Sequence, residues 1–198
     1  MQRWGVESAD GTPPATWREV IGTRSRSLAR TIEHTDAVHR FLGQMSRQAR
    51  KLGCRVVQLD PPHRALRRFR HRGRLRSIHP DAFGILRQGG ETFPFFLEWE
   101  RRAVRPSTMA TRLAPYLRYY SSKQPLDDHG VWPLVLVVFD DQLAESNFHG
   151  VARREMDRAG VDVPLWVSHT ALLQDVGPLG KAWRGPDELE HCYPFGIG

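Results

Sequence analysis

The sequence has few cysteines and no long apolar run. Its two cysteines, Cys54 and Cys192, lie far apart in the chain and form no CxxC pair. This spacing gives no support to a disulfide framework or a cysteine zinc site. The longest apolar run, Pro133 to Phe139, is far shorter than the roughly 20 residues that a membrane helix needs. The sequence therefore excludes a disulfide-stapled domain and a transmembrane protein.

The amino-terminal residues 1–16 contain Glu7, Asp10 and two prolines but no apolar core. We therefore expect a disordered lead-in and no secretory signal, which makes the cytoplasm the default location. No internal repeat is visible. The length of 198 residues favours one domain, which we place at residues 17–185, followed by an irregular tail at residues 186–198.

Lysine is also scarce. Only Lys51, Lys123 and Lys181 occur among the 29 basic residues, so the rest are arginines, and the net charge is +7 with a pI near 10.1. Arginine contacts phosphate through planar, two-pronged hydrogen bonds, so polyanions and above all nucleic acids are the expected partners. A codon bias in a GC-rich genome would produce the same excess of arginine.

Apolar periodicity and turn residues predict an α/β fold. Helical spacing covers residues 17–52 with a break near Gly22, and helix-start residues occur at Pro106-Ser107-Thr108. Asp141 is expected to cap a helix that ends at Gly160. The expected strands are residues 54–59, 80–86, 92–101, 134–139 and 163–167, with residues 63–76 as a loop or irregular hairpin and residues 124–130 as a loop.

The order of these elements predicts a three-layer α/β/α domain with a mixed central sheet. Two β-rich segments joined by Gly89-Gly90 form the clearest hairpin. The continuous apolar segment Leu134 to Phe139 is typical of a strand covered on both faces, and we expect it at the centre of the sheet.

Three carboxylates gather on this hairpin. Asp81 opens one strand, while Glu98 and Glu100 lie two positions apart on its partner. Alternation along a strand places both glutamates on one face and Leu97, Trp99 and Arg101 on the other. Side chains opposite each other on neighbouring strands lie about 5 Å apart, which lets Asp81 and Glu98 share a hard cation such as Mg²⁺. In the alternative interpretation, both glutamates lie on a solvent-exposed hairpin and pair with arginines.

Pro80-Asp81 followed by Glu98-Trp99-Glu100 resembles the PD-(D/E)XK, restriction-endonuclease-like nuclease pattern. Three segments together resemble the replication-relaxation family of bacterial plasmids and integrative elements, and the resemblance spans roughly residues 28 to 170. The segments are Thr31-Ile32-Glu33-His34-Thr35-Asp36-Ala37-Val38, His79-Pro80-Asp81-Ala82-Phe83-Gly84-Ile85-Leu86 and Phe93-Pro94-Phe95-Phe96-Leu97-Glu98-Trp99-Glu100-Arg101.

The resemblance implies a nuclease-like core that acts on mobile DNA. The matching acidic positions, which it marks as candidate catalytic residues, are Glu33, Asp81, Glu98 and Glu100. Asp81 and Glu98 would hold Mg²⁺ or Mn²⁺. Glu100 departs from the pattern because it occupies the lysine position. A carboxylate there can act as a base or a second metal ligand, or the positive charge can come from Arg101, Arg102 or Arg112.

An arginine-rich run precedes the hairpin and is a candidate for contacts with phosphates. Its members, together with two arginines that follow the hairpin, form the expected nucleic-acid surface: Arg64, Arg67, Arg68, Arg70, Arg72, Arg74, Arg76, Arg101 and Arg112. Phe69 and His71 are expected to be available for stacking on bases. A solvated basic loop is the alternative interpretation.

Three functions fit these observations. The first is a metal-dependent endonuclease or nickase of a mobile element, and the second is an inactive nuclease fold that binds DNA or partners a replication or transfer enzyme. The third is a protein-interaction subunit that docks through exposed Trp99, Tyr119 and Tyr120. The sequence does not define an oligomeric state.

Overall fold

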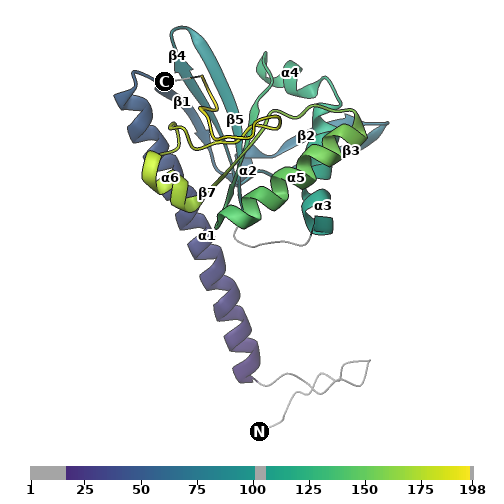
Figure 1. Cartoon of the computed structure of the whole chain (residues 1–198). Helices are drawn as coiled ribbons and strands as arrows, with labels where there is room; N and C mark the ends of the chain where they lie inside the picture. Colours follow the sequence, from purple (N-terminus) through teal and green to yellow (C-terminus); the bar gives the residue numbers. More distant parts are fainter. Residues whose placement is uncertain (1–16, 101–105, 197–198) are drawn as a thin grey trace. The chain divides into compact units, whose positions relative to one another are not determined.

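A computed structural model describes the backbone of residues 17–100 and 106–196 (Figure 1). The chain divides into two compact units, residues 1–37 and residues 38–198. The first unit contains the amino-terminal part of helix α1 (Trp17–Lys51), which runs through Gly22 without the expected break. The second unit contains every strand and all the remaining helices.

The core of the second unit is a five-stranded sheet in the order β1-β4-β5-β6-β7. The strands are β1 (Arg55–Asp60), β4 (Ala82–Gln88), β5 (Glu91–Glu100), β6 (Leu134–Phe139) and β7 (Leu165–His169). The first three strands pair antiparallel, whereas β5, β6 and β7 run parallel, so the sheet is mixed as expected. The central strand is β5, and the expectation that residues 134–139 are central is wrong by one position.

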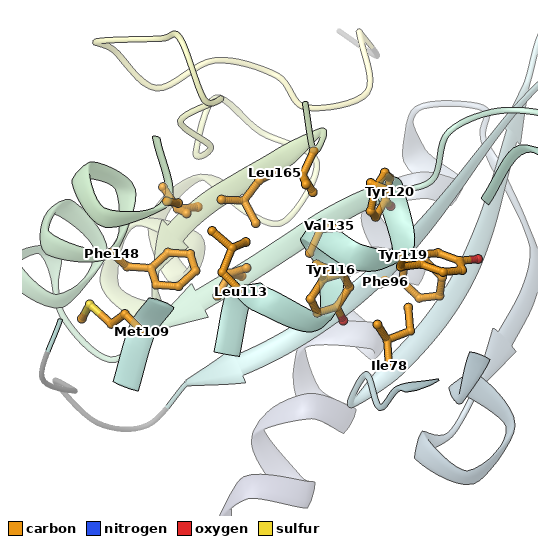
Figure 2. Close-up of a cluster of buried hydrophobic side chains, with 14 of the residues drawn as sticks. Ile78, Phe96, Met109, Leu113, Tyr116, Tyr119, Tyr120, Val135, Phe148 and Leu165 are labelled. Atoms are coloured by element: carbon orange, nitrogen blue, oxygen red, sulfur yellow. The ribbon is translucent and has the colours of Figure 1, made fainter. Parts of the chain in front are cut away.

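Helices cover both faces of this sheet, which gives the expected three-layer α/β/α fold (Figure 1). Helices α3 (Pro106–Tyr120) and α5 (Gln142–Ala159) pack on one face, and α6 (Thr170–Val176) packs on the other with α1 from Val38 onward. Alternate residues of β6 enter the two cores: Val137 faces α3 and α5, while Val138 faces α1 and α6. Figure 2 shows part of the first core.

Local sequence signals predict several of these boundaries closely. Asp141 accepts a hydrogen bond from the backbone N–H of Ala144 at 2.8 Å and caps α5, and Gly160 ends that helix in the left-handed conformation. Gly89 and Gly90 have positive φ at the β4–β5 turn, where glycine avoids steric cost. Strand β7 begins at Leu165, two residues later than expected, because Val163 precedes the pairing with β6.

Other segments differ from the expectation. The arginine-rich run forms a short helix, α2 (Pro62–Ala65), and a regular hairpin of β2 (Arg67–His71) and β3 (Arg74–Ile78). Residues 124–130 were expected to form a loop, but α4 (Gln124–His129) is a helix that ends at Gly130. No helix in the described part of the chain is long and apolar enough to cross a bilayer.

The expected exposure of three aromatic side chains is largely wrong. Tyr119 and Tyr120 are buried in the core, and the Tyr120 hydroxyl donates to the carbonyl of Pro133. Trp99 is half-buried and packs edge-on against Phe41, with ring centroids 5.9 Å apart. The docking surface that these residues were predicted to form is therefore absent from the described residues.

Gly84 on β4 provides a test of this packing. A Cβ atom at this position would lie 2.4 Å from the Phe95 ring on the neighbouring strand. We predict that Gly84→Ala lowers the free energy of unfolding by about 1–3 kcal/mol, because the ring must leave its position in a packed core. Urea denaturation of the purified variant measures this change.

Gly43→Ala is the matched control, because Gly43 lies within α1 in the same unit and its Cβ would meet only the end of the Arg47 side chain at 3.6 Å. Alanine should raise stability there by about 0.5–1 kcal/mol through helix propensity. Equal effects of the two substitutions would contradict the predicted clash.

Candidate functional site

The pairing of β4 with β5 brings Asp81 and Glu98 together. Ala82, the first residue of β4, is opposite Leu97, and the preceding Asp81 donates its backbone N–H to the Leu97 carbonyl at 2.9 Å, which places Asp81 next to Glu98. The Asp81 carboxylate in turn accepts the backbone N–H of Trp99 at 2.8 Å. Strand alternation places Glu98 on the sheet face that packs against α3 and α5. Asp81 lies one residue before β4 and does not open the strand as expected, but its charge acts on both Glu98 and Tyr116.

Glu98 lies in an unusual electrostatic environment. Burial, and after it the negative charge of Asp81, raise the pKa of its carboxyl group to about 8 against the opposing effects of Tyr116 and Arg112. The Tyr116 hydroxyl donates a hydrogen bond to Oε1 of Glu98 at 2.6 Å. Glu98 therefore carries a proton at neutral pH, and it is held in place by a buried tyrosine.

Glu100 shares the same strand face but has a different partner. Its carboxylate forms an ion pair with Arg112, which comes from α3 and has a side chain 49% exposed. A guanidinium thus lies beside Glu100, and the expectation that Arg112 supplies the positive charge of the missing lysine stays a prediction. The other two candidate arginines, Arg101 and Arg102, lie outside the described residues.

Glu98, Glu100 and Arg112, but not Asp81, line a cavity of about 280 Å³. Its polar wall contains Glu98, Glu100 and Arg112 together with Ser77 and His79, whose side chains are hydrogen-bonded at 2.7 Å. Its apolar lining includes Leu113, Tyr116 and Phe148, which Figure 2 shows among the packed side chains of α3 and α5. A cavity lined by both polar and apolar side chains can hold a polar ligand close to the acidic groups.

The predicted acidic residues are not all gathered at this cavity. Glu33 is an exposed residue of α1 in the first unit, and the structure does not define its position relative to the second unit. Within the described part of the chain, the only three His, Cys, Asp or Glu residues with ligand atoms close enough for one ion are Glu145, His169 and His191. The carboxylates that the structure brings together here are the pair Asp81 and Glu98, so metal binding by them stays a prediction.

The β2–β3 hairpin forms a basic surface that leads directly into the cavity. Arg72 and Gly73 make its turn with positive φ, and β3 continues into Ser77 and His79 of the cavity wall. Five of its arginines are exposed and form no ion pair with another described residue: Arg68, Arg70, Arg72, Arg74 and Arg76. These side chains remain available to an anionic ligand.

The inner side of the same hairpin is structural. The Arg67 guanidinium donates to the carbonyls of residues 64, 65 and 66 and lies 4.4 Å above the Phe83 ring. Phe69 is buried edge-on against Tyr119, so the expectation that it stacks on bases is wrong. His71 is half-buried near the Ser121 hydroxyl, and exposed Arg64 lies 3.6 Å from buried Asp60.

Sequence reasoning missed the polar function of Tyr116, which helical spacing assigns only to the core. It also missed Ser77 and His79, although both precede Asp81 in the chain. The group formed by Glu145, His169 and His191 was missed entirely, because its members come from three separate segments.

Residues 5–135 match the family described as replication-relaxation. The chain belongs to the replication-relaxation family. The match includes all four acidic positions, Arg112 and the whole arginine hairpin, but it ends at the start of β6, earlier than the resemblance in the sequence suggested. Family membership indicates a replication-related protein of plasmids or other mobile elements. No curated protein and no solved structure matches the chain.

The protonated state of Glu98 predicts a pH-dependent stability. Its folded pKa of about 8 lies above the ordinary value of 4.5, so the folded protein binds more protons than the unfolded chain between these pH values. The free energy of unfolding should therefore fall as pH rises from about 4.5 to 8. Glu98→Gln cannot ionise at this position. We therefore expect the free energy of unfolding of this variant, relative to that of the wild type, to rise by up to a few kcal/mol between pH 5 and pH 9.

Urea denaturation at both pH values measures this difference. Glu91→Gln is the matched control, because Glu91 is exposed at the β4–β5 turn. A pH-dependent gain of equal size in both variants would show that Glu98 is not the group responsible.

Proposed function

We propose that this protein processes the DNA of a plasmid or integrative element as a divalent-metal-dependent endonuclease or nickase. The observation that carries the proposal is the position of the Asp81 carboxylate next to Glu98, close to the arginine hairpin that ends at the same cavity. The family membership supports a role in replication, and the five exposed arginines of the hairpin suit a phosphate backbone.

The chemistry of the two carboxylates suits Mg²⁺ or Mn²⁺, which prefer oxygen ligands. Glu98 holds a proton because it is buried beside a second carboxylate, and a cation can take the place of that proton. When bound, such an ion polarises a phosphodiester and lowers the pKa of a coordinated water molecule. Once Glu98 loses its proton, it and Asp81 carry the charge that a hard cation would balance.

The remaining residues have distinct proposed roles. Tyr116 positions Glu98 through its hydroxyl, and Arg112 supplies a positive charge that can stabilise the phosphate as negative charge develops on it. Glu100 can act as a base once a substrate draws Arg112 away from it. A catalytic role for Glu33, which belongs to the first unit, stays a prediction that rests on the family resemblance.

The proposal predicts cleavage of supercoiled plasmid in the presence of Mg²⁺ or Mn²⁺ and none in EDTA. Asp81→Asn and Glu98→Gln should each reduce the rate at least about 100-fold, equivalent to roughly 3 kcal/mol of transition-state stabilisation. The wild-type rate should rise with pH toward about 8, since the proton on Glu98 must leave before its carboxylate can bind a cation. Agarose-gel separation of nicked and linear forms measures these rates.

Glu91→Gln again serves as the control and should cleave at the wild-type rate, because its side chain is exposed at the far turn of the hairpin. Undiminished cleavage by both site variants would rule out Asp81 and Glu98 as metal ligands.

DNA binding has a separate test in the arginine hairpin. Each phosphate contact adds about 0.9 to the negative slope of log affinity against log salt concentration. The double variant Arg68→Gln, Arg70→Gln should therefore lower the magnitude of this slope by about 1–2 for duplex DNA. Arg158→Gln is the matched control, because Arg158 is an exposed arginine of α5 that pairs with Glu155. Titration by fluorescence anisotropy at several salt concentrations measures the slopes, and equal slopes for the two variants would contradict a role for the hairpin.

A second candidate function keeps the DNA binding and omits the cleavage. The ion pair between Glu100 and Arg112 and the hydrogen bond from the Trp99 N–H to Asp81 favour it, because both satisfy acidic groups without a metal ion. The protein would then be an inactive nuclease-fold subunit that partners a replication or transfer enzyme. Salt-sensitive binding that persists in EDTA, with no strand breaks at any metal concentration, would support this function over the first.

A further inference from the structure

A second polar cluster lies at the carboxyl ends of β6 and β7, apart from the cavity beside Asp81 and Glu98. It contains Glu145 from the first turn of α5, His169 at the end of β7, and Arg184 and His191 from the segment after α6. We call it the Glu145 cluster. The carboxyl ends of parallel strands are a frequent location of ligand sites in α/β folds. The whole cluster lies beyond residue 135, where the family match ends.

Burial of Glu145 makes this cluster unusual. Its side chain is fully buried, and a buried carboxylate is stable only when other groups compensate its charge. The Arg184 guanidinium, 2.9 Å from Oε1, already supplies one compensating charge. Two imidazoles nevertheless turn their ring nitrogens toward the same carboxylate, which is more than a balance of charge requires.

The distances are those of a ligand set that is nearly assembled. Nδ1 of His169 lies 2.6 Å from Oε2 of Glu145, and Nε2 of His191 lies 3.1 Å from Oε1. One ligand atom from each of the three residues falls within 4.8 Å of the others. Zinc bonds of about 2.1 Å in a tetrahedron place ligand atoms roughly 3.4 Å apart, so shifts of less than about 1 Å would admit an ion.

We propose that Glu145, His169 and His191 bind a divalent transition metal, with Zn²⁺ as the ion that fits best. Two imidazole nitrogens and one carboxylate oxygen suit zinc and its neighbours, whereas Mg²⁺ and Ca²⁺ prefer sites made of oxygen. The site is therefore distinct in chemistry from the carboxylate pair proposed for Mg²⁺ or Mn²⁺. This inference does not depend on the proposed nuclease function.

Arg184 has the position of an outer partner that orients the ligating carboxylate, as such groups do in zinc sites. Its Nε atom is also buried, and none of the described residues accepts a hydrogen bond from it. A further acceptor, such as a water molecule on the metal, would satisfy that donor. The histidine side chains are 14% and 20% exposed, so solvent can reach the edge of the cluster.

A bound ion would join three parts of the fold that are separate in sequence. It would fasten the segment after α6 to the start of α5 and to the end of β7. Within that segment, backbone pairing of Val167 with Arg184 and of Trp183 with Cys192 already brings His191 toward the sheet. Three protein ligands also leave the fourth zinc position open to solvent or to a substrate.

The test uses the full chain, stripped of metal with a chelator and then titrated with Zn²⁺ against a chromophoric zinc indicator. We expect one zinc ion per chain, and at least a tenfold loss of affinity in His169→Asn and in His191→Asn. His149→Gln is the matched control and should bind as the wild type, because its ring contacts the Gly185 carbonyl at 2.8 Å outside the cluster. Parallel titrations with Mn²⁺ and Mg²⁺ should show weaker binding.

Cobalt substitution of the wild-type protein keeps the test decisive if a variant fails to fold. The visible spectrum of Co²⁺ should show tetrahedral nitrogen and oxygen ligation without the charge-transfer band of a thiolate. A thiolate band would implicate Cys192 and overturn this ligand set. Zinc binding that is absent in the wild type, or unchanged in both histidine variants, would also overturn it and leave an ion-pair network alone. Asp81→Asn should bind zinc normally, which separates this inference from the nuclease proposal.

Discussion

The antiparallel register between β4 and β5 is the constraint on which the candidate site depends. It places Glu98 next to Asp81 on a sheet face that α3 then covers, and burial, with the charge of Asp81 after it, raises the pKa of Glu98 to about 8. A shift of one residue in this register would turn Glu98 toward α1 and would place Leu97 against α3. The bulky apolar residues that flank the site, Phe83 and Phe96, fix the register because they lie opposite each other and pack together in the core under α3 and α5, with ring centroids 5.2 Å apart.

Helix α3 completes the site from above the sheet. One turn separates Arg112 from Tyr116, so both side chains reach the same strand, where one neutralises Glu100 and the other donates to Glu98. The core residues between and beside them fix the distance between α3 and the sheet. The packing of α3 thus sets the electrostatics of β5, and a change in the core near Leu113 would alter the acidic groups without touching them.

Features that depend on neighbouring residues in the chain were predictable from the sequence. The β4–β5 hairpin follows from strand alternation and the Gly89-Gly90 turn, and the start of α5 follows from the capping chemistry of Asp141. The shared face of Glu98 and Glu100 follows from the same alternation. In each case a few adjacent residues determine the geometry, whatever packs around them.

Features that depend on distant packing were not predictable. Phe69 lies in a run of arginines, and only the docking of Tyr119 explains why it is buried. The phenol of Tyr116 reaches Glu98 because of the position of α3, which helical spacing does not define. Residues of the Glu145 cluster are unremarkable one by one and meet only when β7 and the segment after α6 come together. A helix as short as α4 cannot be distinguished from a polar loop by composition.

The contacts that anchor the β2–β3 hairpin to the domain restrict its motion. Arg67 is bound to three carbonyls and lies flat on Phe83, while Phe69 is embedded beside it, so the two-stranded ribbon cannot pivot where it joins the domain. The ribbon therefore presents its exposed arginines in a fixed direction relative to the sheet. A rod-like polyanion that binds along these arginines must therefore take a fixed angle to the sheet. Because the ribbon is already held in place, it loses little conformational entropy when the polyanion binds.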